Sequence, residues 1–258
     1  TNNMLSDLSR QQRVDILIVG ASDAYRSYDT RIFSDNGYSV FNAGSSSQTP
    51  MQTYLLLKDN IERLSPRLVL YEVSPICFEL DGVESTTDLM LNGYSHKSIF
   101  PLIFRNPDIH LVNSFLFDFA DRHVVKRSVK NFNSSKEKYI SNGFVEMNLS
   151  YNTVKPIGGK IWEPKQSQLY YFKKILGLLK YRNSNYILIN APSLTDKEFI
   201  NRHVFDSLFM NSGTYLNGLD QPGFDPEKDF FDLSHLNQSG VKKWDSIVLE
   251  KINKFYRH

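Results

Sequence analysis

Short apolar runs alternate with amphipathic stretches along most of the chain. Four successive apolar residues, Ile16 to Val19, are typical of a strand that is buried on both faces of a parallel sheet. Similar runs predict five strands, at 14–20, 38–42, 67–73, 185–190 and 213–216. Apolar residues with helical spacing predict helices at 50–64, 166–180, 196–209 and 241–255. The stretch 24–35 is expected to contain a short helix or helical turn.

Strands that alternate with helices predict an α/β fold, here a three-layer α/β/α sandwich around a central, mostly parallel sheet of about five strands. The 258 residues are within the range that one α/β domain fills, so residues 1–258 are predicted to form a single domain. The stretch at about 79–165 does not continue the pattern. We expect it to be a substrate-side insertion, in which residues 98–119 form short helices packed over the carboxyl edge of the sheet.

Composition excludes several classes of function. The formal charge of +2 is close to neutral and does not suggest a nucleic-acid partner. The single cysteine, Cys77, excludes an intramolecular disulfide and a cysteine-based metal site. The other internal histidines are scattered singly without metal-ligand spacing, so we expect neither a metal nor another cofactor; they are His96, His110, His123 and His203.

The first candidate for chemistry is the turn after the first strand, where Gly20, Ala21 and Ser22 precede a short helix. Such a turn places a hydroxyl at the carboxyl edge of the sheet, where open α/β folds bind their ligands. Ser22 is therefore a candidate nucleophile. A Ser at this position is also typical of a simple helix cap, and the turn alone does not distinguish the two.

The second candidate lies near the other end of the chain. Asp232 and His235 are three residues apart, followed by Asn237 and an amphipathic helix that Asn237 is suited to cap. A serine hydroxyl attacks at neutral pH only when a base takes its proton, and that base is usually a histidine oriented by a carboxylate. One short loop thus supplies both groups.

These blocks together resemble the SGNH (GDSL-type) hydrolases. The resemblance rests on Gly20-Ala21-Ser22, on Asn42-Ala43-Gly44 and on Asp232-Leu233-Ser234-His235, in that order. Within this superfamily the chain looks most similar to the bacterial cell-envelope branch, which includes proteins that move or remove acyl groups on polysaccharides. The resemblance implies the flavodoxin-like SGNH fold, Ser22 as nucleophile, His235 as base and Asp232 as its orienting carboxylate. It also implies an oxyanion hole formed by the main-chain N–H groups of Asp23 and Gly44.

The chain departs from the family after the third predicted strand. The family has Gly-x-Asn-Asp there, and its Asn donates a hydrogen bond to the oxyanion, whereas this chain has Glu72-Val73-Ser74. An ionised glutamate has no hydrogen to donate, so Glu72 is expected to be a structural partner of a nearby arginine or hydroxyl. Loss of one oxyanion donor typically costs about 100- to 1000-fold in rate, which favours a specialised deacylase or transferase over a general esterase.

Three further side chains are candidate substrate contacts. Arg26 follows Ser22 by about one helical turn and is suited to a substrate oxygen, although a pair with Asp29 explains it more simply. Ser74 lies at the end of the third strand. Trp162 lies in the insertion and is a candidate platform for a sugar ring.

The sequence therefore predicts a serine-dependent esterase or deacylase that acts on an O-acylated, most simply O-acetylated, carbohydrate. An O-acyltransferase of a cell-envelope polysaccharide and a non-catalytic carbohydrate-binding protein remain as alternatives. The resemblance implies a periplasmic or cell-envelope location. Because the chain opens on Thr1, we expect a signal or membrane anchor before this residue in the native protein. The oligomeric state is not indicated.

Overall fold

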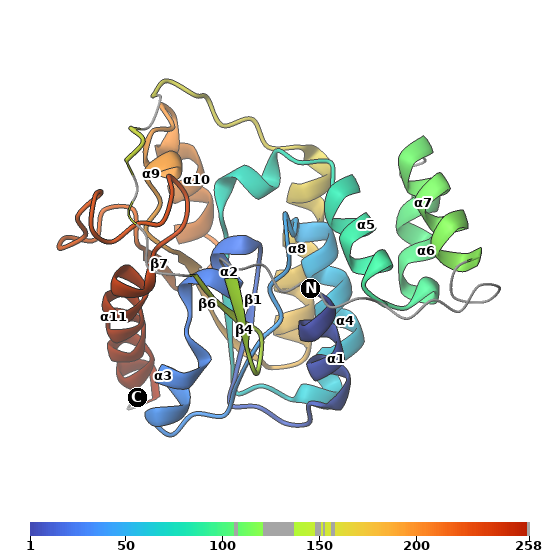
Figure 1. Ribbon diagram of the computed structural model, residues 1–258, viewed down its shortest axis with the longest axis horizontal. Coiled ribbons are helices and arrows are strands. Elements are labelled where there is room, and N and C mark those ends of the chain that lie inside the picture. The colour runs from blue at the N-terminus through green and yellow to red at the C-terminus, as the bar shows by residue number, and fades with distance from the viewer. Residues whose placement is uncertain (106–107, 121–136, 148–150, 152, 156–157, 257–258) are drawn as a thin grey trace.

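A five-stranded parallel sheet forms the centre of the computed structural model, which describes residues 1–258 except 106–107, 121–136, 148–150, 152, 156–157 and 257–258 (Figure 1). The strand order is β2-β1-β3-β6-β7, and every neighbouring pair is parallel. The strands are β1 (Ile16–Val19), β2 (Val40–Asn42), β3 (Leu68–Glu72), β6 (Asn185–Asn190) and β7 (Tyr215–Asn217). This confirms the predicted α/β fold and all five predicted strands.

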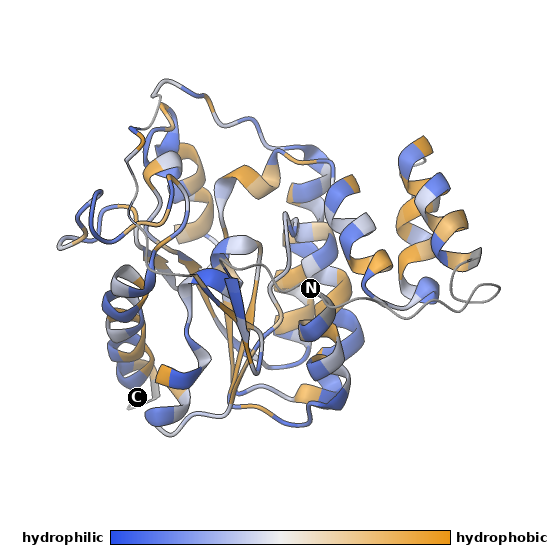
Figure 2. Ribbon diagram, viewed as in Figure 1, coloured by the Kyte–Doolittle hydropathy of each residue, from blue (hydrophilic) through white to orange (hydrophobic). Residues whose placement is uncertain are grey.

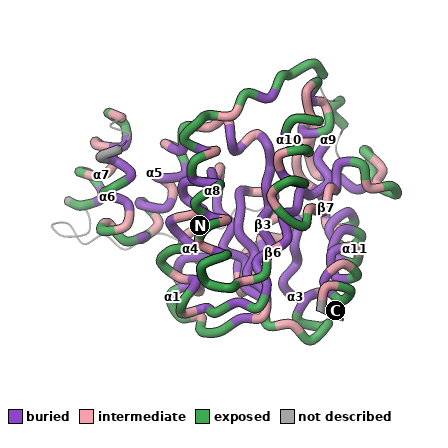
Figure 3. The backbone as a smooth tube through the Cα atoms, turned by 180° about the vertical axis from the view of Figure 1, so that it is seen from behind, coloured by how far each residue is buried: buried purple, intermediate pink, exposed green. Residues whose placement is uncertain are grey.

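Side chains alternate between the two faces of the sheet along each strand. Helices cover both of these faces. In β1, Leu17 and Val19 enter one core cluster and Ile16 and Ile18 the other. Seen from behind, β3 and β6 are buried between the helical layers (Figure 3). The first cluster contains side chains of α1 (Asn2–Arg10), α4 (Pro50–Leu64), α8 (Gln166–Tyr181) and α10 (Arg202–Met210), and the second those of α3 (Thr30–Asp35) and α11 (Gln238–Tyr256).

Two stretches that were expected to contain helical structure each contribute to two helices. The stretch 24–35 forms α2 (Ser22–Ser27) and α3, because the Asp29 carboxylate accepts the main-chain N–H of Arg31 and caps a new helix. The stretch 196–209 forms α9 (Leu194–Lys197) and α10. Helix α1 was not among the predicted elements.

The short helices of the insertion do not lie where they were expected. A 3₁₀ helix (Pro75–Phe78) precedes the insertion, which contains α5 (Val83–Leu91), α6 (His96–Arg105) and α7 (Ile109–Ala120). Helices α6 and α7 stand beside α5, at the side of the α4–α8 layer and away from α2 at the carboxyl edge (Figure 1). The expectation that they cover the carboxyl edge is wrong. Both helices are rich in apolar residues (Figure 2), and Phe117 of α7 is 60% exposed.

A β-hairpin from the same insertion lies beside α2 and β2. It consists of β4 (Glu137–Ile140) and β5 (Phe144–Met147), which pair antiparallel. The main-chain N–H of Asn42 donates to the carbonyl of Asn142 at 2.8 Å. Gly143 has φ +97°, and a Cβ there would lie 1.8 Å from the Asn42 carbonyl oxygen. Only glycine therefore permits this close approach of the hairpin to β2.

The sheet topology marks one place as a site for ligands. The chain passes from β1 to β2 on one side and then to β3 on the other, so the order reverses at β1. The carboxyl end of β1 is thus a topological switch point, where open α/β sheets bind their ligands. Ser22 follows this end by three residues. Among the described residues, no helix is both long enough and apolar enough to cross a bilayer.

Candidate active site

The turn between β1 and α2 places Ser22 at the carboxyl edge of the sheet. Gly20 has φ +146°, and a Cβ there would lie 2.6 Å from the Cβ of Glu72. The turn therefore requires a glycine, because L side chains rarely adopt this backbone conformation and the site lacks space for one. Ser22 then begins α2 and is half-buried.

The loop that carries Asp232 and His235 is held by main-chain hydrogen bonds. Phe231 N–H donates to the His235 carbonyl at 2.8 Å, and the loop closes through a bridge between Phe230 and Leu236. Oδ1 of Asn237 accepts the N–H groups of Ser239 and Gly240 at the start of α11, as predicted for a helix cap. The loop is also tied to α9, because the N–H groups of Leu194 and Thr195 donate to the Leu233 carbonyl.

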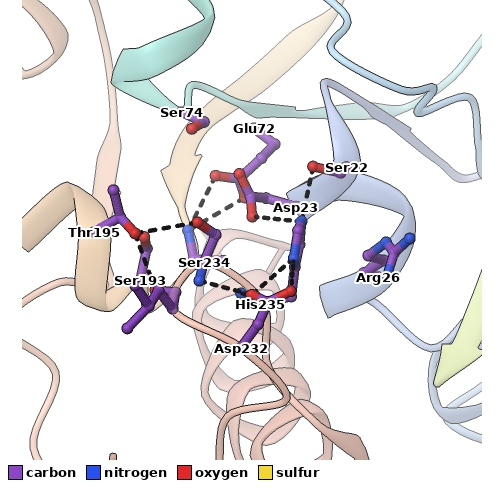
Figure 4. Close-up of polar contacts among 12 residues, drawn as sticks. Ser22, Asp23, Arg26, Glu72, Ser74, Ser193, Thr195, Asp232, Ser234 and His235 are labelled. Atoms are coloured by element: carbon purple, nitrogen blue, oxygen red, sulfur yellow. Dashed lines mark hydrogen bonds and ion pairs between the residues drawn. The ribbon is translucent and has the colours of Figure 1, made fainter. Parts of the chain in front are cut away.

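These two segments, more than 200 residues apart in sequence, meet at the site (Figure 4). Oγ of Ser22 lies 2.8 Å from Nε2 of His235. Nδ1 of His235 lies 2.9 and 3.0 Å from the two carboxylate oxygens of Asp232. With the Nδ1 hydrogen donated to the carboxylate, Nε2 is the acceptor for the serine hydroxyl, which is the arrangement of a nucleophile, a base and an orienting acid.

Asp232 stays charged over the ordinary pH range. Partial burial alone would raise the pKa of its carboxyl, but hydrogen bonds from His235 Nδ1 and from the main-chain N–H groups of Ser234 and His235 lower that pKa to about 2. A permanent negative charge at this position stabilises the cationic form of His235 and fixes the tautomer that leaves Nε2 unprotonated.

The two groups expected in the oxyanion hole differ in their surroundings. Gly44 lies close to α2, and a Cβ there would lie 2.9 Å from the Cβ of Ala24. Its N–H donates to Oδ1 of Asn42 at 3.0 Å, and Nδ2 of the same side chain donates to the Ala24 carbonyl. The N–H of Gly44 therefore already has an acceptor. The N–H of Asp23 lies in the first turn of α2, directly after Ser22.

Arg26 does not face the site. Its guanidinium donates to Glu137 of the hairpin at 2.7 Å and to the sulfur of Met147 at 2.8 Å. In Figure 4 it lies apart from Ser22 and His235. The simpler expectation for Arg26, a pair with Asp29, is also wrong, because Arg31 pairs with Asp29 at 2.6 Å.

Trp162 and Ser74 are both buried. Trp162 is only 3% exposed, packs edge-on against Phe78 and Phe205, and donates its indole N–H to the Pro75 carbonyl at 2.8 Å. A ring enclosed in this way cannot serve as a platform for a sugar. The Ser74 hydroxyl donates to Asp196 at 3.1 Å, so it contacts an acid behind the site.

A cluster of three buried carboxyl groups lies behind Ser22, and the sequence analysis did not detect it. Glu72 accepts hydrogen bonds from the Tyr28 hydroxyl and from the N–H of Ala191, as expected for a structural partner of a hydroxyl. Burial raises the pKa of Glu72 and that of Asp23, and it raises the pKa of Asp196 to about 7. The three acids come from β3, α2 and α9, and therefore no local pattern joins them.

This cluster makes the fold less stable as the pH rises. The pKa of Asp196 is about 7 in the folded chain and about 3.9 in an unfolded one. Its contribution to stability is therefore complete below about pH 4 and is lost as the pH rises through 7. We expect a higher melting temperature at pH 5 than at pH 8, and a smaller difference in Asp196→Asn. About 1 kcal/mol moves the melting temperature of a chain of this size by about 2–4 °C, so calorimetry resolves the effect.

The control for this prediction is Asp225→Asn. The pKa of Asp225 is lowered, chiefly by a hydrogen bond from the main-chain N–H of Glu227, so this acid is ionised throughout the window from pH 5 to 8. The control variant should keep the wild-type dependence of the melting temperature on pH. If the melting temperature of Asp196→Asn depends on pH as steeply as that of the wild type, the prediction is contradicted.

Comparisons with known proteins do not assign this chain to a family. No protein-family model matches the sequence, and no curated protein matches it. The chain is similar to the structure of a protein from Bacteroides fragilis described as an acylhydrolase, with 13% identity, 95% of this chain and 88% of that chain covered and a TM-score of 0.43. It is also similar to a GDSL-like lipase from Bacteroides thetaiotaomicron, with 13% identity, 95% and 90% covered and a TM-score of 0.45. These values are too low to assign a family, and the function is therefore inferred from the geometry of the site.

Proposed function

We propose that this protein is a serine esterase that works through an acyl-enzyme intermediate. The observation that carries the proposal is the pair of contacts made by His235, at 2.8 Å to Oγ of Ser22 and at 2.9 Å to the carboxylate of Asp232. Ser22, Asp232 and His235 are each partly exposed.

The reaction follows from this arrangement. His235 takes the hydroxyl proton of Ser22 while the serine oxygen forms a bond to the ester carbonyl carbon. The bond from that carbon to the alcohol oxygen then breaks, and His235 returns the proton to the departing alcohol. Water then attacks the acyl-enzyme through the same steps, which releases the acid and restores Ser22. Asp232 keeps its charge throughout and stabilises the imidazolium.

For the substrate we propose an O-acylated carbohydrate, with acetyl as the simplest acyl group. This part rests on the resemblance of the sequence to cell-envelope enzymes, which also supports a periplasmic or envelope location. If a sugar hydroxyl replaces water in the second half of the reaction, the same residues transfer the acyl group. Mass spectrometry of the products from an acetylated oligosaccharide, with and without an acceptor sugar, distinguishes hydrolysis from transfer.

A serine-directed fluorophosphonate probe tests the proposal. The probe should form a covalent adduct on Ser22, identified by mass spectrometry of the peptide, because an activated serine oxygen attacks phosphorus as it attacks an ester. Ser22→Ala should remove the labelling entirely. The matched control is Ser234→Ala, since Ser234 lies in the histidine loop but its hydroxyl contacts Thr195 at 3.2 Å.

Two results would contradict the proposal. Labelling that persists in Ser22→Ala would remove Ser22 from the chemistry. A wild-type protein that is neither labelled nor able to hydrolyse p-nitrophenyl acetate would favour the non-catalytic, carbohydrate-binding alternative.

A further inference from the structure

An open pocket of about 660 Å³ lies between the β4–β5 hairpin and the first turns of α11. One wall comes from the hairpin and the other from the helix, although more than 90 residues separate them in sequence. The hairpin contributes Lys138, Glu146 and Met147, and α11 contributes Gln238, Lys242 and Lys243. Lysine is thus the commonest residue of the lining.

Both walls of the pocket begin close to the candidate triad. Gln238 follows His235 by three residues, and three residues of extended chain span at most about 11 Å. On the other side, the sulfur of Met147 accepts a hydrogen bond from Arg26 at 2.8 Å. Arg26 follows Ser22 by four residues of α2, which is about 6 Å along the helix axis. The pocket therefore flanks the groups that attack the ester.

The acidic groups in and around the pocket already contact cations. Glu146 lies 2.8 Å from the guanidinium of Arg31, which also pairs with the buried carboxylate of Asp29. Nζ of Lys243 lies 2.7 Å from the buried carboxylate of Asp229. These contacts engage the one acid of the lining and one of its three lysines.

Lys138 and Lys242 are left without a countercharge. Neither side chain forms an ion pair or a hydrogen bond with any residue that the structure describes. They come from opposite walls of the pocket, Lys138 from β4 and Lys242 from α11, and both are exposed. A cleft lined by charges of one sign concentrates ligands of the opposite sign, so the pocket is suited to an anion.

We propose that this pocket binds a negatively charged group of the carbohydrate substrate, a carboxylate or a phosphate, through Lys138 and Lys242. The inference rests on the proposed esterase function and narrows its substrate to an acidic carbohydrate. The acyl ester lies at Ser22 while the charged group, on the same sugar or a neighbouring one, lies in the pocket. A lysine ammonium offers three N–H donors on a flexible stem and binds either anion as a point charge.

An NMR titration of the protein with three probes tests the inference. A trimer of galacturonate supplies carboxylates, mannose 6-phosphate supplies a phosphate, and a trimer of galactose is the neutral match. We expect at least one acidic probe to bind more tightly than the neutral trimer. The double variant Lys138→Gln/Lys242→Gln should weaken this binding by about 3- to 30-fold, the range for loss of two exposed charge pairs. It should also reduce the dependence of the affinity on salt.

The matched control is the double variant Lys173→Gln/Lys180→Gln. Both lysines are exposed on α8, which packs on the other face of the sheet from α11. Neither has an ion pair with the residues that the structure describes. The control removes the same charge from the protein and should bind the acidic probe as the wild type does.

The outcomes separate this inference from the function on which it rests. If neither acidic probe binds more tightly than the neutral trimer, or if the Lys138 and Lys242 variant binds as tightly as the wild type, the inference is overturned. An equal loss in the control would also overturn it, because the overall charge would then attract the probe. A wild type that is labelled at Ser22 but does not bind an acidic probe keeps the esterase function and loses this inference. A wild type that binds the probe but is never labelled keeps the anion site and loses the esterase function.

Discussion

His235→Ala should lower kcat/KM for ester hydrolysis by about 10⁴- to 10⁶-fold, the range for removal of the base from a serine triad. The imidazole is the group that contacts the hydroxyl of Ser22 at 2.8 Å and can take its proton. Without it the serine stays protonated at neutral pH, and alanine offers no substitute. Hydrolysis of p-nitrophenyl acetate should fall to the rate of the buffer, and labelling by the fluorophosphonate should slow in parallel.

His203→Ala is the matched control for this substitution. His203 is exposed on α10 and lies outside the site, so its removal should leave the rate within about twofold of wild type. Equal rates in the wild type and in His235→Ala would mean that the observed hydrolysis is background and that His235 does not act as the base.

Asp232→Asn should lower kcat by about 10³- to 10⁴-fold with little effect on the fold. Asparagine keeps the Oδ1 acceptor for the main-chain N–H groups of Ser234 and His235, both at 2.8 Å, and thus preserves the loop. Its amide, however, cannot supply the negative charge that stabilises the imidazolium, and it permits the tautomer with the proton on Nε2. The measurement is kcat together with the melting temperature.

Asp225→Asn is a close match in exposure, because the Asp225 side chain is 42% exposed and that of Asp232 is 45% exposed. It removes an acid from the same region without touching His235 and should keep nearly full activity. A wild-type rate in Asp232→Asn would show that the loop alone orients the histidine. Since the pKa of Asp232 is about 2, its titration should not appear in a pH–rate profile between pH 4 and 9.

The chain's local patterns gave the elements that position the site. The apolar run of β1, the glycine that ends it and the Asn237 cap of α11 depend on nearest neighbours in sequence, and all three were found as predicted. Resemblance to ordered blocks added that Ser22, Asp232 and His235 belong together. The structure brings these three side chains within hydrogen-bonding distance.

The roles expected for Arg26 and Trp162 failed for one shared reason. A side chain next to a candidate nucleophile, or an aromatic ring in an insertion, has no local signal that states its partner. Arg26 is held by Glu137, 111 residues away, and Trp162 donates to the carbonyl of Pro75, 87 residues away. Such partners are set by how the hairpin and the 3₁₀ helix pack against the sheet.

The sequence by itself determined the parallel sheet and the order of its strands along the chain, because periodicity and turn chemistry act over a few residues. The resemblance added serine, histidine and aspartate as candidate site residues. Only the tertiary structure decided which groups near Ser22 are engaged, which side chains are enclosed and where the insertion lies. It alone brought Asp23, Glu72 and Asp196 together, since three different elements must meet before their carboxyl groups influence one another. The charge and the burial of these carboxyl groups depend on the three elements together and not on any one segment.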